Sequence, residues 1–175
     1  VSMAQRFTQT LEIHRGSDLP SRVADNMLWL GRYIERTEGM LRVVRSALNR
    51  INSETRLDLI GEFSFLLRMM AKLDIISTAL AQPDVTHDRQ IVEKEIIGAM
   101  FAIEPTGSIR GSLNNVKNMA TSVRDRLSND SWHILGRIGN ELKRFAPHHH
   151  NQISEVQEIV NEVLLILSAF AGLAL

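Results

Sequence analysis

The spacing of apolar residues between positions 21 and 53 is the feature that most restricts how this chain can fold. Apolar side chains recur there at steps of three, four and seven residues, which is the period of a buried stripe along an α-helix and not of a strand. The stripe consists of Val23, Met27, Leu30, Ile34, Leu41, Val44, Leu48 and Ile51. It predicts one helix of about thirty residues, roughly 45 Å long. Ser21 is its expected N-cap, and Asn52 and Ser53 are its expected end.

The rest of the chain repeats the helical period between short segments rich in Pro, Gly, Asn and Ser. We expect five further helices, over residues 54–80, 87–102, 109–127, 129–145 and 153–175. The expected N-caps are Thr86 for the second of these helices, Ser108 or Thr106 for the third and Ser128 for the fourth. Because short connections between long helices favour antiparallel neighbours, the sequence predicts an all-α protein, an antiparallel bundle of about six helices.

Charge and composition exclude several functional classes. Lys plus Arg and Asp plus Glu number 20 each in 175 residues, so the chain lacks the basic excess with which proteins neutralise nucleic-acid phosphates. It also has no cysteine, which excludes disulfides and thiolate chemistry. We therefore expect a single domain of a cytoplasmic protein that binds no nucleic acid.

Neither end of the chain resembles a targeting or membrane segment. Residues 1–17 lack the apolar core of a signal peptide, and we interpret them as an irregular lead-in or linker from an upstream domain. The longest uncharged apolar run, residues 163–175, has 13 residues. A bilayer span needs about 20, so we expect no association with a membrane.

A second stripe on the first helix carries planar polar and aromatic groups. Its members follow one another at steps of four and three residues: Arg22, Asn26, Trp29, Tyr33 and Arg36. Guanidinium groups bind carboxylates and phosphates through paired hydrogen bonds. The stripe is therefore either a polar binding groove or a network that fixes helix register, and general physical grounds favour the network.

Glu35 and Glu38 flank this stripe, and Glu38 can pair with Arg42 one turn further on. Gly31 and Gly39 lie inside the same helix, where each costs about 1 kcal/mol relative to alanine. Two such glycines indicate that a neighbouring helix approaches closely.

The sequence offers no metal, cofactor or nucleophile motif. His148, His149 and His150 are adjacent in a Pro-containing loop without a nearby carboxylate, so we interpret them as solvated. Glu-x-x-His pairs and a Gly-x-Ser-x-Gly elbow are both absent from the sequence. We expect no bound metal and no cofactor.

The stretch from residue 19 to 38 resembles the opening of the bacterial alpha-E domain family, a family long described as a domain of unknown function. Members begin with a pattern like LSRVA-x-x-L-x-W-x-GRY-x-ER-x-E, and this chain matches it at Ser21, Arg22, Val23, Ala24, Trp29, Gly31, Arg32, Tyr33, Glu35, Arg36 and Glu38. A second family segment is matched at Pro105, Ser108, Ile109, Asn118, Val123, Arg124, Leu127, Ser128, Trp132 and Leu135. The chain departs from that segment at Lys117, where the family has an acidic residue, and at Ala120, where it has an arginine.

The resemblance implies an alpha-E-like helical domain over residues 18–175. The family's domain usually continues with another helix containing Gly-Arg and Glu-Arg, so the chain looks like the first half of the domain. Members similar to this one are fused behind a circularly permuted ATP-grasp domain, and others occur beside transglutaminase-like proteins. These associations imply a link to ATP-dependent peptide or amide-bond formation, with Arg22, Asn26, Trp29, Tyr33, Arg36, Arg124 and Trp132 as candidate binding residues.

Three functional hypotheses follow. The first is an accessory domain that docks on an ATP-grasp ligase, or presents a peptide substrate to it. The second is an enzyme acting on peptides, formed by the complete two-half domain, with Glu35 or Glu38 as acid/base. The third is an oligomerisation module that pairs through the apolar C-terminal helix.

Overall fold

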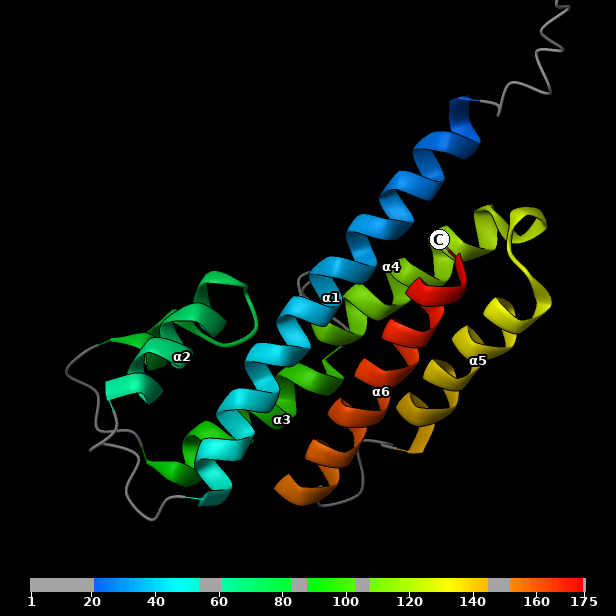
Figure 1. The fold of residues 1–175 in the computed structure, drawn as a ribbon. Coiled ribbons are helices and arrows are strands. Elements are labelled where there is room, and N and C mark those ends of the chain that lie inside the picture. Colours follow the sequence, from blue (N-terminus) through cyan, green and yellow to red (C-terminus); the bar gives the residue numbers. More distant parts are fainter. Residues whose placement is uncertain (1–20, 54–60, 83–87, 103–107, 145–151, 175) are drawn as a thin grey trace, which may run out of the picture.

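The computed structural model describes residues 21–53, 61–82, 88–102, 108–144 and 152–174 (Figure 1). Six α-helices follow one another: α1 (Ser21–Ser53), α2 (Gly61–Lys72), α3 (Arg89–Phe101), α4 (Ile109–Ser122), α5 (Asn129–Arg144) and α6 (Ile153–Ala174). Two short 3-10 helices, η3 (Thr78–Ala81) and η4 (Arg124–Arg126), interrupt the connections. The described residues contain no strand. The predicted all-α class, the six helices and the long first helix, which has 33 residues, are confirmed.

α1 is the longest element, and the other helices pack along it. α4 and α6 run antiparallel to α1 and make its most extensive contacts, while α5 lies on the other side of α6 (Figure 1). α2 packs beside the C-terminal part of α1, and η3 packs on α2 (Figure 1). The N-terminal turns of α1 project beyond the ends of α4 and α6.

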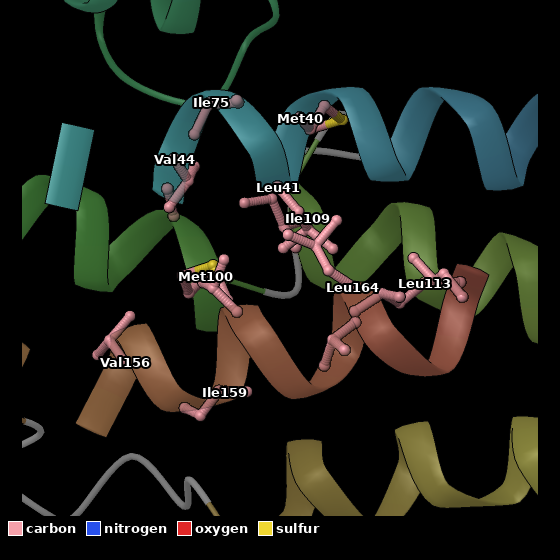
Figure 2. Packing of buried hydrophobic residues seen from close by; sticks show 14 of the residues in the cluster. Met40, Leu41, Val44, Ile75, Met100, Ile109, Leu113, Val156, Ile159 and Leu164 are labelled. Atoms are coloured by element: carbon pink, nitrogen blue, oxygen red, sulfur yellow. The ribbon is translucent and has the colours of Figure 1, made fainter. Parts of the chain in front are cut away.

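The predicted apolar stripe of α1 forms the centre of the core. Leu30, Ile34, Leu41, Val44, Leu48 and Ile51 are all buried. Figure 2 shows α1, α4 and α6 directing side chains into this common core, among them Leu41, Ile109 and Leu164. Val23 and Met27 are only half-buried, because this part of α1 lies where the helix projects from the bundle.

The predicted helix over residues 54–80 is wrong in its extent. α2 ends at Lys72, and Asp74 adopts a left-handed backbone conformation with a φ of 57°. The Ile75 amide donates to the Met70 carbonyl at 2.9 Å, and the Asp74 amide donates to the Ala71 carbonyl at 3.1 Å. These two bonds form a Schellman motif, which ends a helix by satisfying its last carbonyls. The apolar period continues past the motif in Ile75 and Ile76, both buried, which explains the overestimate.

Two other helix limits also differ from expectation. α4 ends at Ser122, and the chain then forms η4, although Val123 and Leu127 remain buried as the period predicted. α3 is capped by Asp88, whose carboxylate accepts from the Gln90 amide at 2.9 Å. The expected cap, Thr86, lies outside the described residues.

The expected caps of α4 and α5 are confirmed. Ser108 Oγ accepts from the Gly111 amide at 3.0 Å, and Ser128 Oγ accepts from the Ser131 amide at 3.0 Å. The Ser108 hydroxyl also donates to the Ala102 carbonyl at 2.9 Å, which ties the start of α4 to the end of α3. These bonds satisfy amide groups that a helix N-terminus leaves without partners.

The prediction that Gly31 and Gly39 admit a neighbouring helix is wrong within the described residues. Both glycines are exposed, and a Cβ atom added at either position would meet nothing within 4 Å. The buried side of α1 is formed by the apolar stripe, and the two glycines lie away from it.

Among the described helices, α6 alone is long and apolar enough to cross a bilayer. It meets this criterion only by the length and composition of Ile153–Leu173. It packs between α1 and α5, and a core helix of a globular protein meets the same criterion. The absence of a membrane partner stays a prediction.

Candidate functional site

The N-terminal part of α1 carries an exposed face formed by one helix alone. We call it the α1 face and define it by the residues Arg22, Asn26, Trp29, Arg32, Tyr33 and Arg36. The four at its centre, Arg22, Trp29, Arg32 and Arg36, are exposed. Asn26 and Tyr33 are half-buried at its edge. Three members of the predicted stripe, Arg22, Trp29 and Arg36, therefore face solvent, while Tyr33 packs against the core.

Trp29 and Tyr33 form an aromatic pair on the α1 face. Their ring centroids lie 6.0 Å apart with a 35° angle between the planes, an arrangement in which aromatic rings attract one another. Trp29 is nevertheless 50% exposed, and its neighbour Leu28 is 61% exposed. An exposed tryptophan beside an exposed leucine is an unusual feature for a surface that contacts only water.

The backbone beneath the aromatic pair is held in place from the buried side. Thr37, which is fully buried, donates from its hydroxyl to the Tyr33 carbonyl at 2.6 Å. Leu30 and Ile34 are buried on the same side of α1. The rings therefore stand on a rigid helix surface, which lowers the entropic cost of binding through them.

The three arginines of the α1 face, Arg22, Arg32 and Arg36, are available for binding. None of them forms a hydrogen bond or ion pair with another described residue. A shallow depression runs between residues 27 and 36, and every residue that lines it belongs to α1. This geometry suits the docking of another surface better than the enclosure of a small molecule.

The two candidate acid/base residues have different surroundings. The Glu38 side chain is 15% exposed and accepts from Arg42 Nη2 at 2.9 Å and from Ser168 Oγ at 3.2 Å. Glu38 therefore links α1 to α6, and the predicted Glu38–Arg42 pair is confirmed. Glu35 is exposed and has no hydrogen-bond partner among the described residues.

Arg124 and Trp132 form a separate cluster. The Arg124 guanidinium carbon lies 4.9 Å from the centroid of the Trp132 ring, a cation–π contact. Arg124 also donates to Asn129 Oδ1 at 3.0 Å and to the Leu127 carbonyl at 3.4 Å. These contacts hold η4 against the start of α5, and no hydrogen bond, ion pair or ring contact between described residues joins them to the α1 face.

A second exposed feature, which the sequence did not single out, is an open groove of about 500 Å³ between α5 and α6. We call it the α5–α6 groove. It is lined by Glu141, Glu155, Glu158, Ile159, Asn161, Glu162 and Leu165. Arg137 of α5 pairs with Glu162 at its edge. The spacing of Glu155, Glu158 and Glu162 along one helix face was the available sequence signal.

The described residues contain no group of three or more His, Asp or Glu side chains that could hold a metal ion. His148, His149 and His150 lie outside the described residues. The expectation of no metal and no cofactor therefore stays a prediction.

The fold and the α1 face together define a helical module with an exposed aromatic and basic face. The chain belongs to the Alpha-E family, described as a predicted α-helical domain with a conserved ER motif, whose model matches residues 19–175. Glu-Arg occurs once in the sequence, at Glu35 and Arg36, so the arginine of the pair lies on the α1 face.

Three long mycobacterial proteins are similar to part of the chain. Uncharacterized proteins of Mycobacterium bovis and of two Mycobacterium tuberculosis strains are each 27% identical to it over 124 residues. The match covers 67% of this chain and 14% of each relative's length. No solved structure matches the chain significantly.

Proposed function

We propose that the chain is an α-helical accessory domain that uses the α1 face to dock on an ATP-grasp ligase, or to present a peptide substrate to it. The observation that carries the proposal is the aromatic pair of exposed Trp29 and half-buried Tyr33, set among three arginines without partners in the described residues. Tryptophan, tyrosine and arginine are the residues that most often dominate the energy of protein interfaces.

The link to a ligase rests on the sequence resemblance to domains fused behind a circularly permuted ATP-grasp domain. The matched mycobacterial relatives are consistent with an accessory role, because the shared segment is a small part of each of them. The arginines add a chemical argument, since guanidinium groups recognise the carboxylates that peptide substrates and acidic protein surfaces carry.

The enzyme alternative has less support. Glu38 is already bound by Arg42 and Ser168, and Glu35 lies on an open helix surface from which water is not excluded. General acid/base catalysis by a glutamate normally requires a sheltered carboxylate. The glutamates stay candidate acid/base residues in the hypothesis of an enzyme formed by a two-half domain.

Binding of the ATP-grasp domain encoded in the same or a neighbouring reading frame tests the proposal. We expect Arg36→Ala and Tyr33→Ala each to weaken binding roughly tenfold or more, the loss expected when an interface anchor is removed. Arg45→Ala is the matched control, because Arg45 is an exposed arginine of α1 outside the α1 face. Unchanged binding and unchanged ligase turnover in both face variants would show that the face has another use.

A further inference from the structure

The α1 face and the α5–α6 groove lie toward opposite ends of the molecule. The N-terminal turns of α1 project at one end, beside the C-terminal end of α6 (Figure 1). The groove lies along the N-terminal half of α6 and the C-terminal half of α5, which meet at the other end. The two features therefore cannot contact each other within one rigid molecule.

The α1 face presents a basic and aromatic line. Arg22, Trp29 and Arg36 are separated by seven residues each, so they lie along one line of the helix. Arg32 is exposed beside this line, and so are two acids, Asp25 and Glu35, so the arginines of the face outnumber its neighbouring exposed acids by three to two. The line is thus positively charged on both sides of an exposed tryptophan.

The α5–α6 groove has the complementary chemistry. All the charged residues that line it are glutamates: Glu141, Glu155, Glu158 and Glu162. Leu165 lines the same groove and is 62% exposed, while Ile159 is buried at its base. An exposed leucine among carboxylates suits a partner that brings an apolar side chain flanked by cations.

We propose that the α1 face of one molecule docks into the α5–α6 groove of a second copy, head to tail. Trp29 covers Leu165, and the flanking arginines pair with Glu155 and Glu158, because Glu162 is already paired with Arg137. The chain has no net charge, so copies do not repel one another overall, while the segregated charges of the face and groove attract. When two copies bind in this way, one α1 face and one α5–α6 groove stay unoccupied. Further copies can therefore add to form a linear assembly, or the assembly closes into a ring.

This inference goes beyond the proposed function and does not depend on it. The same face cannot bind a second copy and an ATP-grasp domain at once. If the proposed function also holds, self-association competes with docking on the ligase.

Sedimentation velocity of the purified chain at several concentrations tests the proposal. We expect the mean mass to rise with concentration at about 0.1 M salt and to fall to that of the monomer at about 1 M salt, because the Debye length shortens from about 10 Å to about 3 Å.

Paired charge reversals test the contact itself. Arg32→Glu/Arg36→Glu and Glu155→Lys/Glu158→Lys should each be monomeric, with self-association weakened at least tenfold. An equimolar mixture of the two should associate again, because each acidic face then meets a basic groove and each basic face an acidic groove. Arg45→Glu/Arg68→Glu, which reverses two exposed arginines elsewhere, should behave as the unmodified chain.

Three results would overturn the proposal: an unmodified chain that stays monomeric at low salt, association that survives both reversals, or a mixture that fails to reassociate. If the double groove variant does not fold, Glu158→Lys alone replaces it, because Glu158 forms no hydrogen bond with another described residue. The groove variants leave the α1 face intact, so their binding to the ATP-grasp domain reports on the proposed function separately.

Discussion

At the scale of single residues, Glu38 is a candidate catalytic residue whose contacts hold two helices together. In the enzyme hypothesis it is one of the two candidate acid/base residues, with Glu35. In the fold its carboxylate is mostly buried and accepts from Ser168 of the antiparallel α6. A sequence cannot predict this bond, because the two residues are 130 positions apart.

A double-mutant cycle measures the contribution of Glu38 to stability. We expect Glu38→Ala and Ser168→Ala to be coupled by about 1 kcal/mol in urea unfolding, the usual net value of a hydrogen bond to a part-buried group. Additive effects of the two substitutions would show that the bond does not stabilise the fold.

Gly39 gives a second prediction at this scale. It lies exposed inside α1 with no atom within 4 Å of an added Cβ. Gly39→Ala should therefore raise the free energy of unfolding by about 0.5–1 kcal/mol, because alanine restricts the unfolded chain and favours helix. A destabilised variant in denaturant titration would mean that another helix does pack against this position.

At the scale of the helices, periodicity was sufficient to find the elements but not all of their ends. The apolar stripe of α1 was predicted well because a seam sustained over a long helix has few alternative explanations. α2 was predicted too long because Asp74 interrupts the backbone without interrupting the apolar period. Sequence signals for a left-handed cap are clear when glycine is present, and aspartate gives only a weak one.

The Schellman motif gives a prediction for this element. Asp74→Gly should stabilise the fold by about 0.5–1 kcal/mol, because glycine adopts a positive φ at no steric cost. Asp74→Ala keeps a Cβ and is the matched control, and it should not stabilise. Thermal unfolding of both variants checks this, and equal melting temperatures would contradict the assigned cap geometry.

At the scale of the whole molecule, functional assignment depends on which surfaces the bundle leaves uncovered. The sequence predicts the polar stripe on α1 and favours a register-fixing network, whereas in the structure Arg22, Trp29 and Arg36 are exposed and only Asn26 and Tyr33 are half-buried. The α5–α6 groove could not be found from the sequence, because it forms only when residues of two helices come together. The family match identifies the chain as an Alpha-E domain, and the α1 face is the most distinctive surface of this domain.

The central claim, that the α1 face serves binding and not folding, is tested most directly by Trp29→Ala. Stability in urea and affinity for the ATP-grasp domain are measured on the same preparation. We predict a change in unfolding free energy within about 0.5 kcal/mol, as for other exposed positions, together with a loss of affinity of roughly tenfold or more. A variant that loses stability but keeps its affinity would contradict the account.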